Sequence, residues 1–357
     1  MPAAQIDLTG GFDPSMDLMS PEIPDDPIYR ESVSMWLFDD ANRIQFPRFL
    51  IEDIIGDRAN RLAFYNVSLP GGRSLVEWGQ APALPMLDET GRPTIYGAGG
   101  VSFRCLEPFR RWVVRMRAEV FDTRTEDLIY GAPTGPRVPI ELEIETTSAV
   151  PPWIYGRHNA YAAKLMEEDT PEAWWTGRGF RYEQLILANG WCKLDGTHYD
   201  FKGRGLRVHR RSMRKGQGFR GHVWQTAVFP SGKAFGYESF PPYPDGTPSF
   251  CEGYFFDGER MLTADPVPAT VPWMVKADDQ PQEVGFTLRT AELGDLRIQA
   301  TSGPTNFSTV RPAMASPTVA DPLLQQQGSA LYSLNGESAY GMIERSNYRS
   351  KIQFARG

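Results

Sequence analysis

A short basic stretch holds the residues of this chain that are best suited to chemistry. Residues 202–220 (KGRGLRVHRRSMRKGQGFR) carry eight Lys or Arg and no Asp or Glu, although the chain has a formal net charge of −7. Charge this concentrated must be solvated, paired with the protein's acids or directed at a ligand. All four histidines lie within or near the stretch, at His158, His198, His209 and His222. We therefore look for a reactive site there first.

Period-2 alternation sorts the side chains of this stretch by strand face. Arg207 and His209 share one face if the stretch is a strand, so both can address one cavity. The imidazole of His209 titrates near neutrality and can accept or donate a proton. Arg207 or Arg214 can hold negative charge that develops on a substrate oxygen. The structural alternatives are a histidine bonded to the backbone and arginines that form ion pairs across the sheet.

Glu183 is the carboxyl that we expect beside this cluster. The turn signal Asp195-Gly196 should bring the strand around Glu183 next to the strand that starts at Tyr199. The sequence therefore predicts a Glu183–Arg207 pair, either as part of the site or as a structural salt bridge.

Six ring-bearing side chains are candidate substrate contacts. They are Tyr182, His222, Trp224, Trp153, Tyr155 and His158. His222 and Trp224 share a face of the β-rich run 221–229 and can complete a pocket wall, although core packing also suits the tryptophan. The run 153–158 follows two prolines in an extended segment, where its rings can hold a phenol or fused ring system or lie on the surface.

The elements that position these residues are mostly strands. Residues 140–145 and 112–120 alternate between apolar and polar side chains, and 221–229 is β-rich. Asp-Gly and Asn-Gly pairs between such runs, as at 195–196 and 335–336, are hairpin signals. A helix is expected only around residues 161–168. Strands in series without alternating helices predict an all-β protein of antiparallel barrels or sandwiches.

The length of 357 residues favours two domains. We expect an extended N-terminal wrap at 1–30, a first barrel at 31–170 and a second barrel at 171–357. The Pro/Ser/Thr/Gln-rich residues 303–327 are expected to form an extended loop.

Composition narrows the functional classes. The acidic balance argues against nucleic-acid binding. Cys105, Cys192 and Cys251 are sparse and odd in number, and the N-terminus lacks an apolar run, so we expect a reducing, cytoplasmic location. The sequence has no run of 18 apolar residues, so we expect no membrane span. Nucleotide-loop, HExxH and GxSxG patterns are missing, so neither a cofactor nor a metal ion is expected.

Several short motifs together resemble a known superfamily. They are Tyr182-Glu183-Gln184, Asn189-Gly190-Trp191, Asp195-Gly196 and the run from Gly203 to His209 (GRGLRVH). Weaker similarities are Cys105-Leu106-Glu107-Pro108 with Arg111-Trp112, residues 141–147 and Gly341 to Glu344. The chain resembles, over about residues 32–345, the AttH-like, lipocalin-like superfamily that groups carotenoid 1,2-hydratase, kievitone hydratase and the fungal lipocalin-like Diels–Alderases.

The match is closest to a bacterial branch with the pattern Gly-x-Gly-x-Arg-Asp-His-Ser-Trp-Gly-x-Arg. Arg207, His209 and Arg214 match its Arg, His and last Arg. Val208 stands at the Asp position, and Arg210 and Arg211 stand at the Ser and Trp positions. The resemblance implies two lipocalin-like barrels side by side and a reaction on a bulky apolar compound, while fold alone does not settle which reaction.

The resulting hypothesis is a cofactor-independent lyase, such as a hydratase, or an isomerase or cyclase. It would use acid–base catalysis on a bulky aromatic or isoprenoid molecule. Arg207 and His209 are expected to point into the second barrel or the groove between the barrels. The alternative is a non-catalytic carrier that holds a hydrophobic ligand in a barrel. Substrate identity and oligomeric state stay open.

Overall fold

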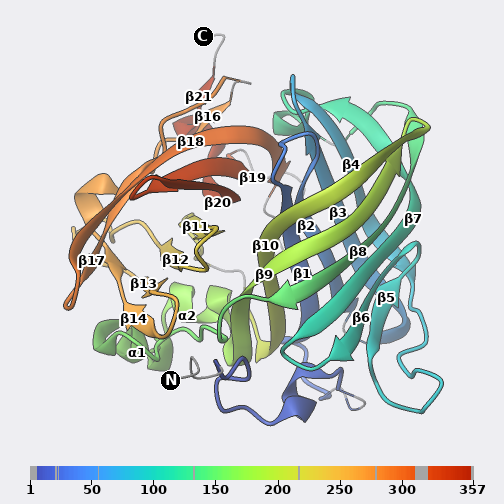
Figure 1. Cartoon of the computed structure of the whole chain (residues 1–357), viewed down its shortest axis with the longest axis horizontal. Helices are drawn as coiled ribbons and strands as arrows, with labels where there is room; N and C mark the ends of the chain where they lie inside the picture. The colour runs from blue at the N-terminus through green and yellow to red at the C-terminus, as the bar shows by residue number, and fades with distance from the viewer. Residues whose placement is uncertain are drawn as a thin grey trace.

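Two curved antiparallel sheets make up most of the molecule (Figure 1). This computed structural model describes residues 6–20, 22, 24–54, 56–131, 133–215, 218–277, 280–309 and 321–354. Its α-helices in these ranges are α1 (Ala160–Glu167), which matches the expected helix, and α2 (Pro171–Thr176). Neither has the length and apolarity to cross a bilayer. The prediction of an all-β fold with two lipocalin-like domains is confirmed.

The first sheet closes into a barrel. Its strand order is β4-β3-β2-β1-β10-β9-β8-β7-β6-β5, and β4 also pairs with β7. The strands are β1 (Tyr29–Asp39), β2 (Gln45–Ile54), β3 (Asp57–Leu69), β4 (Arg73–Pro82), β5 (Ile95–Ala98), β6 (Val101–Glu107), β7 (Arg111–Arg124), β8 (Arg137–Ser148), β9 (Arg178–Leu194) and β10 (Thr197–Met213).

The second sheet has the order β14-β13-β12-β11-β20-β19-β18-β17-β15. Its strands are β11 (Val223–Val228), β12 (Ala234–Ser239), β13 (Cys251–Phe256), β14 (Met261–Thr263), β15 (Asp265–Pro266), β17 (Phe286–Thr290), β18 (Gly294–Thr309), β19 (Leu323–Leu334) and β20 (Glu337–Tyr348). A short parallel pair joins β16 (Lys276–Ala277) to β21 (Gln353–Phe354). The 3-10 helices are η1 (Pro14–Asp17), η2 (Asp127–Ile129), η3 (Pro268–Thr270) and η4 (Arg349–Lys351).

Two features differ from the sequence-based expectation. The first sheet extends to Met213, past the boundary expected at residues 170 and 171, because the chain returns from α2 to add β9 and β10. The two α-helices therefore lie between two strands of one sheet, β8 and β9, and do not separate the two sheets. The prediction of a loop at 303–327 was wrong at both ends, since β18 extends to Thr309 and β19 begins at Leu323. Its middle, 310–320, lies outside the described residues.

Two predicted hairpin turns set the register of the long strand pairs. Asp195 and Gly196 have φ values of 50° and 75°, and Asn335 and Gly336 have values of 52° and 83°. Two left-handed residues in a two-residue loop are the mark of a type I′ hairpin, whose twist matches that of the strands. The first turn places Val208 directly opposite Glu183.

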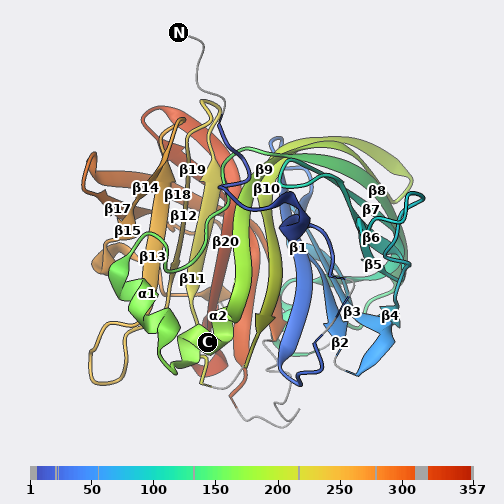
Figure 2. The ribbon, with the colours of Figure 1, turned by 90° about the horizontal axis from the view of Figure 1, so that it is seen from below.

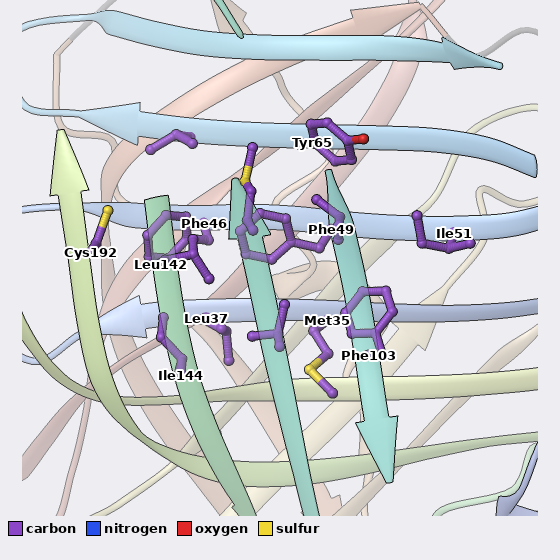
Figure 3. Packing of buried hydrophobic residues seen from close by; sticks show 14 of the residues in the cluster. Met35, Leu37, Phe46, Phe49, Ile51, Tyr65, Phe103, Leu142, Ile144 and Cys192 are labelled. Atoms are coloured by element: carbon purple, nitrogen blue, oxygen red, sulfur yellow. The ribbon is translucent and has the colours of Figure 1, made fainter. Parts of the chain in front are cut away.

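The interior of the first barrel is filled by the apolar half of each alternating strand. Ile140, Leu142 and Ile144 of β8 are buried. They join a core that includes Met35, Leu37, Phe46, Phe49, Phe103 and Cys192 (Figure 3). The intervening Glu141, Glu143 and Glu145 face outward and pair with arginines of β7. The period-2 prediction for 140–145 and 112–120 is thus confirmed.

The outer face of the first sheet packs against the second sheet. β1, β9 and β10 contact β11 and β20, and Figure 2 shows β20 beside β9 and β10. Their apolar contact layer includes Trp36, Leu185 and Leu206 from the first sheet and Trp224 and Met342 from the second. This face-to-face contact forms the walls of the candidate site.

Candidate active site between the two sheets

The alternation of β10 sends its charged residues to two different places. Arg207 and His209 point into the first barrel, and Val208 and Arg210 point toward the second sheet. Because directly opposite residues of an antiparallel pair share a face, Glu183 lies with Val208 and Arg181 lies with Arg210. The predicted cluster is therefore split between the two faces of one strand.

Arg207 and His209 share a face, as predicted, but they do not reach the groove between the barrels. Both are 0% exposed. Arg207 makes a two-point ion pair with Asp17 of the N-terminal segment, at 2.8 and 3.2 Å. His209 lies between two carboxylates, 3.7 Å from Asp17 and 3.2 Å from Glu31. The expected orientation was wrong because β10 belongs to the first sheet, and the face that carries both side chains turns toward the first barrel, where the N-terminal segment meets them.

Asp17 is the centre of this sealed network. It also accepts hydrogen bonds from Tyr182, from the backbone N–H of Phe109 and, at 3.0 Å, from the indole N–H of Trp112. Burial alone would raise the pKa of Asp17, but Arg207 and His209 hold it well below its usual range. The network stabilises the N-terminal segment against the first barrel.

Glu183 does not pair with Arg207, so that prediction was wrong. Arg207 lies opposite Gln184 in the hairpin, one residue away and therefore on the other face. Glu183 instead pairs with Arg181 at 2.6 Å and accepts a hydrogen bond from the indole of Trp224 at 3.2 Å. Both contacts place it at the interface between the sheets.

A cavity of about 40 Å³ lies at this interface. Its cationic lining consists of Arg48, Arg181, Arg210 and Arg214, and its other charged or titratable lining consists of His222, Glu238 and Glu344. The rings of Trp36, Trp175 and Trp224 also border it. On the same measure one water needs about 10–15 Å³, so the cavity has room for a few waters or a compact polar group.

Two carboxyl groups beside this cavity share one tyrosine hydroxyl. The Tyr155 hydroxyl is hydrogen-bonded to both Glu183 and Glu238. One hydroxyl has a single proton, so the Tyr155 hydroxyl can donate to only one of the two carboxyl groups at a time. Burial, reinforced by Glu238, raises the pKa of Glu183 to about 7 against the pull of Arg181. Glu183 therefore retains its proton up to about neutral pH.

The opposite end of the cavity carries a histidine–carboxylate pair. His222 Nε2 lies 3.1 Å from Glu344, and Nδ1 lies 2.7 Å from the hydroxyl of Ser346. Glu344 also accepts hydrogen bonds from the amides of Gln325 and, at 2.6 Å, Gln327. Burial opposes ionisation, but the hydrogen bond from His222 and its neighbours keep the pKa of Glu344 below its usual value. This carboxylate is satisfied and held in place.

Half of the predicted site residues line this cavity or belong to the carboxyl network beside it. Arg214, His222 and Trp224 line it. Glu183 and Tyr155 form the carboxyl network beside it, and the Trp153 ring packs against Tyr155 at 4.6 Å. His158 does not border it, since it precedes α1 and donates its backbone N–H to Glu252 at 3.2 Å. Tyr182, Arg207 and His209 belong to the sealed network around Asp17.

Sequence reasoning missed Arg48, Arg181, Arg210, Glu238 and Glu344 as site residues. Arg210 was visible as an arginine at a Ser position of the superfamily pattern, on the strand face opposite to His209. The others lie on β2, β9, β12 and β20, and only the packing of one sheet on the other brings them together. No local sequence signal marks them.

Solved structures place this architecture in the class of all-β, two-domain lipocalin-like folds. A putative AttH from Nitrosomonas europaea is 14% identical with a TM-score of 0.50, over 93% of this chain and 97% of that chain. CghA in complex with Sch210972 is 10% identical with a TM-score of 0.50, over 90% and 89%. The superfamily resemblance seen in the sequence is thus confirmed at the level of the fold.

Within that class, the chain belongs to the family described as a domain of unknown function, DUF7064. The model of this family matches residues 13–349. No curated protein matches the chain.

Proposed function

We propose that this protein is an enzyme that carries out acid–base catalysis at the cavity between the two sheets. The observation that carries the proposal is the buried Glu183, which Tyr155 links to Glu238 beside a cluster of arginines. Carboxyl groups whose environments force a proton to remain near neutral pH are typical of general acids. The structural similarity to CghA with its bound Sch210972 supports an organic small molecule as substrate.

Glu183 is the proposed source of the proton, and Tyr155 links it to Glu238, which borders the cavity directly. The proton passes from Glu183 through the Tyr155 hydroxyl and Glu238 to a substrate oxygen or carbon. This leaves the Glu183 carboxylate, which then takes a proton back by the same route from substrate or water. The neighbouring guanidinium groups stabilise negative charge that develops on a substrate oxygen.

The reaction class that fits is addition or elimination of a small molecule such as water, or an isomerisation or cyclisation. Addition, elimination and double-bond isomerisation each deliver a proton at one atom and remove one at another, whereas a cyclisation uses the donor to polarise a substrate oxygen; none requires a redox partner. The rings of Trp36, Trp175 and Trp224 suit an aromatic or isoprenoid skeleton. At about 40 Å³ the cavity accepts only one functional group of such a molecule, so the rest of the molecule must lie outside the cavity, whose border includes Trp175 of α2.

Turnover by Glu238→Gln tests the proposal. Purified protein is incubated with a panel of phenolic and isoprenoid compounds, and products are followed by mass spectrometry for gain or loss of water or for isomers of unchanged mass. We expect the variant to lose about 10²–10⁴-fold of turnover. Glu143→Gln, on the outer face of β8, is the matched control and should keep full activity. Full turnover by Glu238→Gln would remove this carboxyl from the mechanism, and tight binding without turnover across the panel would favour the carrier.

A further inference from the structure

We infer that the cavity between the sheets binds the carboxylate group of a hydrophobic organic acid, with Arg210 as its principal partner. The inference rests on the proposed function in that it names the substrate class of the same site. It stands on three observations. Arginines of the cavity form no ion pair with the described residues, Arg210 lies opposite another arginine across two strands, and aromatic rings line the cavity.

Arg210 is a buried cation that forms no direct ion pair with the residues that the structure describes. Its side chain is 8% exposed and lines the cavity. Within the described part of the chain, no hydrogen bond or ion pair engages its guanidinium, and its Nε is left without an acceptor. Burial, together with the charges of Arg214 and Arg181, lowers the pKa of Arg210 well below its usual value. A buried charge is retained in proteins when something compensates it.

Two further arginines of the cavity are also without carboxylate partners. Arg214 donates its Nε to the backbone carbonyl of Trp175 at 2.6 Å and stacks on that ring. Arg48 contacts the faces of Trp36 and Phe64, and its Nε has no acceptor among the described residues. Rings and a carbonyl do not neutralise these charges. Three cations therefore face the cavity with no ion pair of their own in the residues that the structure describes.

The strand register adds a second indication. Arg210 stands directly opposite Arg181 on β9, and like charges in that position destabilise a sheet. Arg181 is paired with Glu183, and Glu344 is satisfied by His222 and two glutamines, so neither acid is available to Arg210. An arginine that faces a like charge and has no carboxylate of its own among the described residues is typical of a site that binds the opposite charge.

The lining defines the rest of the ligand. A carboxylate matches the fork of a guanidinium group and fits a cavity of about 40 Å³. The rings of Trp36, Trp175 and Trp224 at its edge favour a flat apolar body attached to that carboxylate. The ligand chemistry is therefore an aromatic or polyunsaturated acid, in preference to a free inorganic anion.

Binding of 2-naphthoate, its neutral amide and inorganic phosphate tests this inference by calorimetry and thermal unfolding. We expect naphthoate to bind at least about tenfold more tightly than the amide and to raise Tm. Arg210→Met should abolish that preference, whereas Arg115→Met, which removes an exposed charge on β7, should keep it. Equal binding of acid and amide, no binding of either, or a Tm rise with phosphate alone would overturn the inference.

The same variants separate this inference from the proposed catalysis. Glu238→Gln should retain the naphthoate preference, because the cations remain. A retained preference without turnover in the wild-type protein would overturn the catalytic role alone. Turnover of neutral compounds without any acid preference would overturn the carboxylate site alone.

Stability provides a test that needs no ligand. Arg210→Met, with Arg210→Gln as a second variant, should raise the Tm of the free protein because it removes an uncompensated buried charge. Arg207→Met is the contrast on the same strand, and it should lower Tm because it leaves Asp17 unpaired. An equal loss of Tm in all three variants would identify Arg210 as a structural cation and overturn the inference.

Discussion

Arg207 and Arg210 lie three residues apart on one strand and have opposite surroundings. Arg207 is neutralised by Asp17 and also donates a hydrogen bond to the amide oxygen of Gln184, whereas Arg210 faces a cavity and two other arginines. Both arginines are buried, so the presence or absence of a carboxylate beside the guanidinium decides whether the charge stabilises the fold or binds a ligand. Burial of an arginine in itself therefore does not distinguish a structural from a functional role.

Asp17→Asn should destabilise the protein by about 3–5 kcal/mol, because it leaves the buried guanidinium of Arg207 without a counterion. The free energy of unfolding in urea measures the effect. Asp13→Asn is the matched control four residues earlier, where the exposed side chain caps η1 and an asparagine caps equally well. A loss below about 1 kcal/mol in Asp17→Asn would contradict the structural role of this network.

At the scale of the strands, two glycines of β10 allow β1 and β10 of the first sheet to approach closely. Gly203 and Gly205 of β10 cross β1 so closely that an added Cβ would lie 1.9 Å from the carbonyl oxygen of Phe38 and 1.8 Å from that of Trp36. The Gly-x-Gly pattern here permits close strand approach, with no connection to a nucleotide loop. It also fixes the position of Trp36 at the wall of the cavity.

Gly205→Ala should therefore cost about 1–3 kcal/mol of stability through overpacking. The displacement of β1 should also change the fluorescence of the tryptophans at the interface. Urea unfolding followed by fluorescence measures both effects. Gly131→Ala, where an added Cβ meets no atom within 4 Å, should leave stability unchanged within about 0.5 kcal/mol. An unperturbed Gly205→Ala would show that β1 and β10 are not held at this spacing.

The strands themselves were largely predictable from the sequence, and the site was predictable only in part. Alternation located β7, β8 and β10 and placed Arg207 and His209 on one face, because that depends on neighbours along the chain. The pairing of Glu183 failed by one residue of register, which turns a side chain to the other face of a sheet. Arg48 and Glu344 meet at the cavity from β2 and β20, and the local pattern carries no information on such contacts.

At the scale of the whole molecule, the contact between the sheets is both core and site. Trp36 and Trp224 meet edge to face across it with ring centroids 5.1 Å apart. Asn66 of β3 donates to Gln327 of β19 at 2.7 Å, a buried hydrogen bond between the sheets. A shared apolar layer of this kind couples the stability of the two sheets.

We accordingly expect the two sheets to unfold together. Far-UV circular dichroism and tryptophan fluorescence should give coincident urea transitions with one midpoint. The apolar contact layer would be exposed if one sheet unfolded first, and that exposure opposes a stable half-folded state. Two separated transitions would show that the sheets are independent units and that the cavity is not part of a common core.

The central claim is that Glu183, which Tyr155 links to Glu238, retains a proton near neutrality. Infrared titration between about pH 5 and pH 9 follows the C=O band of protonated buried carboxyl groups, and the spectrum of Glu183→Gln is subtracted. Since the pKa of Glu183 is raised to about 7, its proton is kept below that pH and lost above it. Glu252, whose pKa burial also raises to about 7, is identified separately with Glu252→Gln. We predict a band that is lost in Glu183→Gln and titrates near pH 7. Complete ionisation by about pH 5, as for an ordinary glutamate, would contradict the account.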